Sequence, residues 1–287
     1  MSVKRKIKQL LNKANVIRIV REREVSVPYV INLDKKGRLK GKVAVVTGGS
    51  GVIGRAIAFR LAAEGAKVYV CGSKREKAEP IADEILQAGF QAIPFGFNIT
   101  DENSTVTAFN QIIEDSKHID ILVCCAGGGA REEMKPFINQ SMSVIDSVIN
   151  TNLRGTILST REASRQMVSQ KSGNIVIISS TVGICGMPAY SEYAVAKAGL
   201  MALVKSLAME LGKNGIRINC VTPGIVERGI IDDIKLERIH KTNWLNGYGK
   251  PEDIAGMVAY LNTEEASFIT GQNFVVDGGR SLGLKNN

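Results

Sequence analysis

Apolar and polar positions repeat along residues 42–279 as short apolar runs that alternate with longer amphipathic segments. The short runs are rich in Val and Ile, which is typical of buried strands, and the longer segments place apolar residues three or four positions apart, which is typical of helices. The predicted strands are 42–46, 67–71, 91–97, 120–125, 175–178, 217–221 and 273–279. The predicted helices are 55–65, 75–88, 102–116 after an Asp101 cap, 141–170 with any break near Gly155, the segment that carries Tyr193 and Lys197, and 251–262.

Strands that alternate with helices need crossover connections, so the pattern predicts an α/β fold with a Rossmann-type doubly wound parallel sheet. We expect about seven strands with helices on both faces, in a single domain. Such sheets bind ligands at the carboxyl ends of their strands. The residues that directly follow the predicted strands should therefore lie along one edge, and they include Gly48, Gly72, Asn98, Gly127, Ser180 and Pro223.

Residues 1–41 precede this pattern and carry almost all of the excess charge. Residues 1–42 hold 13 Lys and Arg against 3 Asp and Glu, whereas the whole chain has a net charge of +9. We predict a basic N-terminal extension, 1–41, followed by a catalytic domain, 42–287. The extension begins with a basic amphipathic helix at 3–14 and continues as an extended segment at 16–33. Its role stays open between a docked or subunit-bridging arm, a solvated tail, and contact with a membrane surface or an acidic partner, the last being least favoured.

Because the rest of the chain is nearly neutral, composition gives no reason to expect a nucleic-acid partner. The five cysteines form no C-x-x-C pair and there are only two histidines, which argues for reduced thiols and against a metal site. The sequence shows no apolar run of membrane-spanning length and no leader segment. We therefore predict a cytoplasmic protein.

The sequence TGGSGVIG at 47–54 joins the first strand to a helix. Glycines at that point let the backbone approach a pyrophosphate at the start of the helix, so this turn predicts a dinucleotide site. The candidate contacts in the turn are Gly48, Ser50, Gly51, Val52, Ile53 and Gly54.

The residues after the second strand select between the two nicotinamide cofactors. An acidic side chain there binds the ribose 2′-hydroxyl, whereas a hydroxyl or a basic group accepts the 2′-phosphate. Here Ser73 and Lys74 follow the strand, and no acid occurs before Glu76. The sequence therefore favours NADP(H), with NAD(H) as the alternative.

Tyr193 and Lys197 lie one turn apart on the same face of their predicted helix. A phenol titrates at about 10, and a nearby cation lowers that pKa, so the pair suits proton transfer near neutral pH. Two amphipathic residues on a helix flank would give the same spacing without any chemistry. The surrounding residues must therefore decide between these interpretations.

With these motifs assembled, residues 42–279 resemble the short-chain dehydrogenase/reductase (SDR) family, and in particular its compact branch of 3-oxoacyl reductases. The resemblance implies a catalytic tetrad of Asn152, Ser180, Tyr193 and Lys197. It also implies cofactor contacts from Asn98, Ile99, Ala126, Gly127, Tyr193, Lys197, Pro223, Gly224 and Val226. Val52 departs from the compact pattern at a glycine position and gives a spacing that resembles the extended branch. Cys124 and Cys125 replace a usual Asn-Asn pair, so we expect a hydrogen bond near the cofactor to be lost.

The resemblance further implies hydride transfer between a nicotinamide and a carbonyl or alcohol carbon. Tyr193 would be the general acid/base, Ser180 would polarise the carbonyl, Lys197 would lower the tyrosine pKa, and Asn152 would hold a water. It also implies a homodimer or a homotetramer.

The substrate stays open. A 3-oxoacyl carrier-protein reductase, with Lys171 and Lys213 available to an acidic carrier protein, and a sugar or polyol dehydrogenase are the main alternatives. A sugar-nucleotide epimerase or dehydratase and a non-catalytic NADP-binding scaffold are less favoured. Residues 225–249 are predicted to cover the substrate.

Overall fold

The computed structural model describes residues 37–129, 133, 135–226, 242–247 and 249–283. The chain divides into two units, Met1–Asp34 and Lys35–Asn287, and every described residue belongs to the second. The predictions for 1–36, and those for most of the predicted substrate loop, therefore lie outside the described residues. No helix in the described ranges is long and apolar enough to cross a membrane.

The seven strands form one parallel sheet in the order β3-β2-β1-β4-β5-β6-β7, which confirms the predicted fold class. The strands are β1 (Val43–Thr47), β2 (Lys67–Gly72), β3 (Gln91–Gly96), β4 (Ile121–Cys124), β5 (Gly173–Ile178), β6 (Ile216–Pro223) and β7 (Asn273–Val276). Every residue of β1 and β4 is buried, because central strands of a doubly wound sheet are covered on both faces. Their continuous apolar runs are what identified them in the sequence.

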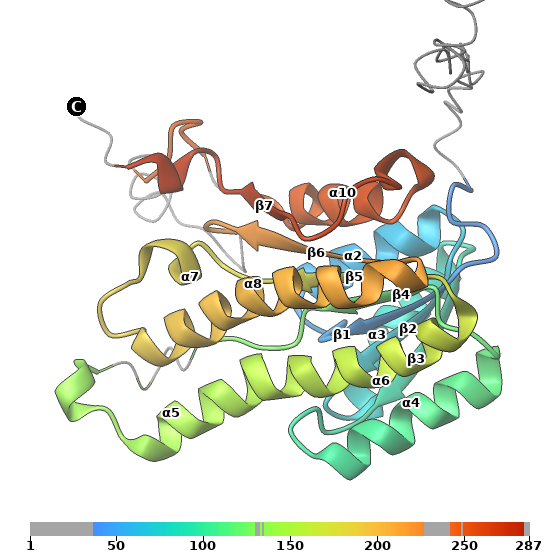
Figure 1. Cartoon of the computed structure of the whole chain (residues 1–287), viewed down its shortest axis with the longest axis horizontal. Coiled ribbons are helices and arrows are strands. Elements are labelled where there is room, and N and C mark those ends of the chain that lie inside the picture. Colours follow the sequence, from blue (N-terminus) through green and yellow to red (C-terminus); the bar gives the residue numbers. More distant parts are fainter. Residues whose placement is uncertain (1–36, 130–132, 134, 227–241, 248, 284–287) are drawn as a thin grey trace, which may run out of the picture. The chain divides into compact units, whose positions relative to one another are not determined.

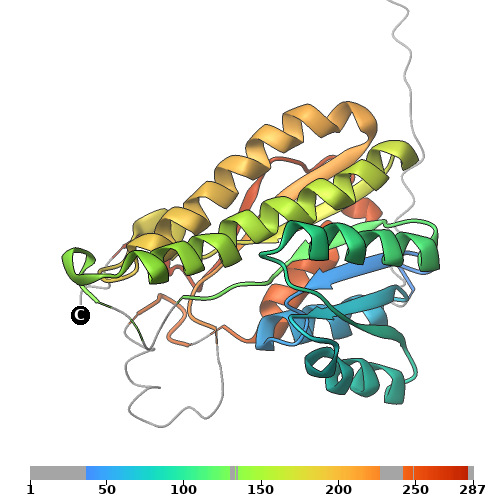
Figure 2. The ribbon, with the colours of Figure 1, turned by 90° about the horizontal axis from the view of Figure 1, so that it is seen from below.

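Helices cover both faces of this sheet (Figure 1). The main helices are α2 (Val52–Ala63), α3 (Arg75–Gln87), α4 (Glu102–Ser116), α5 (Met142–Ile149), α6 (Gly155–Gln170), α8 (Ser191–Leu211) and α10 (Pro251–Leu261). Apolar side chains of α2, α3 and α10 form one core with the strands, and those of α4, α6 and α8 form the second core. In Figure 2, α8 runs beside the continuous α5–α6 helix, with α4 next to α6.

A π-helical turn, Asn150–Arg154, joins α5 to α6 directly before Gly155. The predicted helix 141–170 is therefore continuous but changes its winding where the sequence suggested a break. A Cβ on Gly155 would lie 2.9 Å from the Ile99 side chain, so a glycine is needed where the helix passes this neighbour. Such turns often occur at functional sites, and this one contains Asn152.

The chain enters the described unit through residues 37–42. Leu39 is fully buried in the core with α2, and its amide donates to the Glu64 carbonyl oxygen at 2.9 Å. The Arg38 guanidinium makes two hydrogen bonds to the Glu64 carboxylate, of 2.9 and 2.8 Å. The boundary predicted between 41 and 42 stays a prediction. Because Leu39 is buried against α2, the residues directly before this boundary pack with the second unit.

Candidate active site

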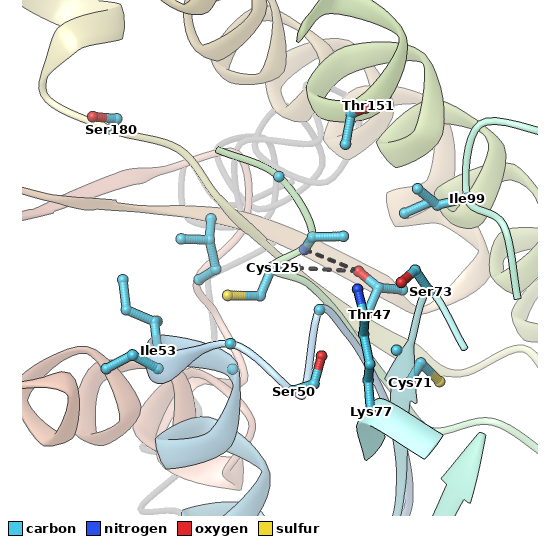
Figure 3. A pocket seen from close by; sticks show the side chains of 18 of the residues that line it. Thr47, Ser50, Ile53, Cys71, Ser73, Lys77, Ile99, Cys125, Thr151 and Ser180 are labelled. Atoms are coloured by element: carbon cyan, nitrogen blue, oxygen red, sulfur yellow. Dashed lines mark hydrogen bonds between the residues drawn. The ribbon is translucent and has the colours of Figure 1, made fainter. Parts of the chain in front are cut away.

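A cavity of about 450 Å³ lies at the carboxyl ends of the strands, at the edge where the sheet order predicts ligand binding (Figure 3). It brings together most of the residues singled out from the sequence. Those that line it are Gly48, Ser50, Gly51, Val52, Ile53, Gly54, Ser73, Asn98, Ile99, Ala126, Gly127, Ser180, Tyr193, Lys197, Pro223 and Gly224. Asn152, Lys74 and Val226 do not line it.

The glycine turn has a backbone shape that side chains would prevent. Gly48 has φ +67°, and a Cβ at this position would lie 2.6 Å from the Ala126 Cα. A Cβ on Gly54 would lie 2.8 Å from the carbonyl carbon of Gly48. Gly51 is the N-cap of α2, whose first turn has no acidic side chain, so its backbone amides are suited to an anionic group. These residues fit a dinucleotide pyrophosphate.

The loop after β4 is fastened to the end of β1 by the side chain of Thr47. Its Oγ1 accepts hydrogen bonds from the amides of Cys125 (3.2 Å) and Ala126 (3.4 Å), and the Thr47 carbonyl oxygen also accepts one from the Cys125 amide, at 3.2 Å. Although Cys124 and Cys125 replace the expected Asn-Asn pair, these hydrogen bonds to Thr47 still join the loop to the end of β1.

Two thiols are buried near the carboxyl ends of the strands, Cys124 at the end of β4 and Cys71 in β2. Burial raises the pKa of the Cys124 thiol to about 12 and also raises the pKa of Cys71. Both groups are protonated at neutral pH, which leaves them unreactive as nucleophiles.

The segment after β2 presents Ser73 and Lys77 to the cavity, and their side chains are drawn as part of its wall in Figure 3. Lys74 is instead the N-cap of α3 and is not part of the wall. Sequence reasoning missed Lys77 because it considered only the first residues after the strand. The signal was present, since Ser73 and Lys77 are four positions apart at the start of a helix.

Asn98 brings a polar side chain to the cavity wall after β3. Its Oδ1 accepts hydrogen bonds from the Thr100 amide (3.1 Å) and the Thr100 hydroxyl (2.8 Å). The turn that follows β3 is thereby held at the cavity wall, together with Ile99 and Thr100.

Tyr193, Lys197 and Ser180 face the same cavity as the glycine turn. Lys197 is only 4% exposed, its Nζ donates to the Ile178 carbonyl oxygen at 3.0 Å, and it lies 5.5 Å from the centre of the Tyr193 ring. The neighbouring Ser179 donates from Oγ to the Lys197 carbonyl oxygen at 2.8 Å. These contacts tie α8 to the end of β5, so the cation is held beside the phenol rather than in solvent.

Asn152 is fully buried and uses its side chain to hold the glycine loop after β4. Its Oδ1 accepts from the Gly128 amide at 3.0 Å, and its Nδ2 donates to the carbonyl oxygens of Gly128 and Val148, both at 2.9 Å. A Cβ on Gly127 would collide with this amide. The predicted role in holding a water stays a prediction; the structure shows a residue that positions the loop.

The Pro223–Gly224 segment completes the wall beyond β6. The Pro223 carbonyl oxygen accepts from the Thr181 amide at 3.0 Å, and a Cβ on Gly224 would lie 2.7 Å from the Asp277 Cβ. Val226 is buried and bridges to Gly249. Because Val226 does not line the cavity, its predicted cofactor contact stays a prediction.

Comparison with known proteins agrees with this geometry. A family model described as enoyl-(acyl carrier protein) reductase matches residues 48–281. The chain belongs to the short-chain dehydrogenase/reductase family. It is thus an oxidoreductase with a site for a nicotinamide cofactor, as the sequence predicted.

Curated SDR relatives match over nearly their whole length. The 3-oxoacyl-[acyl-carrier-protein] reductase FabG of Aquifex aeolicus is 38% identical over 247 residues, which cover 84% of this chain and 98% of the relative. A cyclohexanol dehydrogenase of Rhodococcus sp. is 34% identical over 270 residues, covering 84% and 96%. A crystal structure of a provisionally named gluconate dehydrogenase from Agrobacterium tumefaciens superimposes with a TM-score of 0.81 at 29% identity, covering 86% of this chain and 98% of that one.

Proposed function

We propose that this SDR enzyme interconverts a carbonyl compound and an alcohol with NADP(H), using Tyr193 as general acid/base. The observation that carries the proposal is that Tyr193, Lys197 and Ser180 line the same cavity as the glycine turn. The cofactor and the reacting carbon would therefore meet at these three side chains.

When bound, the nicotinamide supplies or accepts the hydride. The glycine turn would hold the pyrophosphate, since its backbone is clear of side chains and lies at the start of α2. Asn98 and Ile99 would contact the adenine side, and the segments at Ala126–Gly127 and Pro223–Gly224 would contact the remainder.

The roles of the polar side chains follow from their chemistry. The Tyr193 hydroxyl would give a proton to the alkoxide that develops during reduction and take it back during oxidation. The buried Lys197 ammonium would favour the phenolate form that oxidation requires. Ser180 would donate a hydrogen bond to the substrate oxygen, because an uncharged donor stabilises developing negative charge there. Asn152 would act as a positioning residue for the loop after β4.

The preference for NADP(H) rests on the wall after β2. Ser73 and Lys77 both face the cavity, so a hydroxyl and an ammonium are available to a 2′-phosphate. The first acidic residue after β2 is Glu76, which is not part of the wall. Lys77 replaces Lys74 as the cation that we propose to contact the phosphate.

The substrate is proposed from the relatives. A 3-oxoacyl thioester carried by an acidic carrier protein is the first candidate, because the relatives named above include a 3-oxoacyl-[acyl-carrier-protein] reductase. An alicyclic alcohol or a sugar acid is the second, because the Rhodococcus relative is named a cyclohexanol dehydrogenase and the Agrobacterium structure a gluconate dehydrogenase.

We also expect a homodimer or homotetramer. Exposed apolar side chains on neighbouring helices support this, among them Ile157 and Val168 on α6 and Met209 on α8. A cytoplasmic location stays a prediction.

A cofactor-coupled assay tests the function. We expect the enzyme to consume NADPH with acetoacetyl thioesters, or NADP⁺ with cyclohexanol or gluconate. In either direction the rate with the phosphorylated cofactor should exceed the rate with NADH or NAD⁺. Tyr193→Phe should lower kcat by about 100-fold or more, because the proton donor is lost. The matched control is Tyr190→Phe, whose ring stacks edge-on at 6.3 Å from that of Tyr193 but does not line the cavity. Full turnover by Tyr193→Phe would refute the assignment.

A further inference from the structure

The turn that follows β7 contacts both the cavity wall and the predicted substrate loop. β7 lies beside β6 at the end of the sheet (Figure 1), and Val276 pairs with Pro223. The Gly224 amide donates to the Val276 carbonyl oxygen at 3.0 Å, and a Cβ on Gly224 would lie 2.7 Å from the Asp277 Cβ. Asp277, the first residue after β7, is therefore packed against the Pro223–Gly224 wall of the cavity.

The carboxylate of Asp277 fixes the shape of this turn. Its Oδ1 accepts from the Gly279 amide at 2.8 Å, and its Oδ2 accepts from the Ser281 amide at 2.7 Å. Gly278 and Gly279, which lie inside the turn, have φ values of +63° and +82°, a backbone shape that favours glycine. These bonds need two acceptor oxygens on one short side chain, so an aspartate suits the position.

The same turn holds the described end of the predicted substrate loop, residues 242–247. The Gly278 carbonyl oxygen accepts hydrogen bonds from the amides of Trp244 (2.9 Å) and Leu245 (3.2 Å). A Cβ on Gly279 would lie 3.1 Å from Trp244 Cδ1, so the indole lies close to this glycine. Segment 242–247 is thus attached to the turn that Asp277 shapes.

Segment 242–247 is also held together by its own side chains. Asn243 is 6% exposed, its Nδ2 donates to the Gly247 carbonyl oxygen, and its Oδ1 accepts from the Gly247 amide at 3.3 Å. Because these bonds close the segment on itself, a shift of Gly278 would move it as a unit. At the ends of the loop, the Gly249 amide donates to the Ile225 carbonyl oxygen at 3.0 Å.

We propose that Asp277 is a positioning residue that fixes segment 242–247 relative to the Pro223–Gly224 wall, and through it the binding of the substrate. This inference rests on the proposed function. The carboxylate shapes the turn, and the turn holds Trp244 and Leu245. The cofactor wall contacts the Asp277 Cβ and the Val276 carbonyl oxygen instead of the carboxylate. Loss of the carboxylate should therefore weaken substrate binding more than cofactor binding.

Hydrogen exchange of the full chain, measured by mass spectrometry, tests the attachment without using activity. In Asp277→Ala the amides of 242–247 should exchange about tenfold faster, because the turn that holds them loses two hydrogen bonds. Asp277→Asn keeps one acceptor oxygen and should give an intermediate rate.

Asp120→Ala is the matched control for this measurement. Its carboxylate also accepts a backbone amide, that of Val43 at 2.8 Å, but it lies at the opposite edge of the sheet. If Asp277→Ala does not fold, Asp277→Asn decides. Unchanged exchange at 242–247 in the folded Asp277 variant, or an equal acceleration in Asp120→Ala, overturns the proposal.

Steady-state kinetics test the role in substrate binding, with the carbonyl substrate found in the cofactor-coupled assay. The KM for that substrate should rise about fivefold or more in Asp277→Ala and less in Asp277→Asn, while kcat and the Kd of NADPH change by less than about twofold. A merely structural role would lower stability without this split. A loss of NADPH affinity equal to the rise in KM overturns the proposal.

The failure of this inference and the failure of the proposed function give different results. A wild-type enzyme without turnover refutes the proposed function. Normal wild-type turnover with an unchanged KM in Asp277→Ala refutes only the role of Asp277.

Discussion

The glycine turn at 47–54 and the stretch from Ile178 to Lys197, which carries the proposed catalytic residues, face one cavity, yet they keep their shapes by different means. In the turn, the requirement is the lack of side-chain atoms, since a Cβ on Gly48 or Gly54 would enter the volume of neighbouring backbone. In the catalytic stretch, the requirement is the presence of side-chain bonds, such as Lys197 to Ile178 and Ser179 to Lys197. Adding atoms should therefore damage the first region, and removing atoms should damage the second.

The largest effect is expected when an atom is added to the turn. Gly54→Ala should weaken NADPH binding about 100-fold, a cost of roughly 3 kcal/mol, because the new Cβ meets the backbone of Gly48. Fluorescence titration of NADPH measures this. Gly256→Ala in α10 is the control, since a Cβ there would meet nothing within 4 Å and the residue does not line the cavity. If the two variants bind alike, the close approach at Gly54 is not what shapes the turn.

A smaller effect should follow when the side chain that holds the loop after β4 is removed. Asn152→Ala deletes three hydrogen bonds and leaves the amide and carbonyl of Gly128 without this partner. We expect the free energy of unfolding to fall by about 2 kcal/mol, together with a lower kcat. Chemical denaturation and steady-state assays measure the two quantities. Asn150→Ala, at an exposed position of the same π-helical turn, should change neither; an equal loss there would point to the turn itself rather than to the amide.

The Lys77 ammonium, which lines the cavity after β2, should affect the choice between NADPH and NADH more than the free energy of unfolding. Lys77→Ala should raise the KM for NADPH about tenfold while leaving the KM for NADH unchanged, because one charged contact to the 2′-phosphate is lost. Lys74→Ala, which removes a cation outside the wall, serves as the control. The reverse outcome, with Lys74 controlling NADPH, would restore the assignment made from the sequence.

The smallest effect separates two adjacent serines. Ser179→Ala removes the bond to the Lys197 carbonyl oxygen and should lower the free energy of unfolding by about 1 kcal/mol with little change in kcat. Both serines line the cavity, but the Ser180 hydroxyl is the one that we propose contacts the substrate oxygen, so Ser180→Ala should do the opposite. Thermal melts paired with turnover rates distinguish them, and a kcat loss in Ser179→Ala alone would exchange the two roles.

The order of strands and helices could be predicted from the sequence because each element carries its own periodicity. The same holds for Asp101, whose side chain accepts from the Ser104 amide as a cap. The π-helical winding at 150–154 could not be predicted, because the neighbours that the helix passes there, such as Ile99 beside Gly155, are distant in the chain.

By itself, the sequence determined the residue types and spacings of this protein: the glycine turn, the pair Tyr193 and Lys197, and the serine at the end of a buried strand. Local propensity and periodicity fix these, because they depend on neighbours in the chain. Only the tertiary structure decided which cation lines the cavity. Lys77, rather than Lys74, lines the cavity at the carboxyl ends of the strands, because helix phase sets the direction of a side chain.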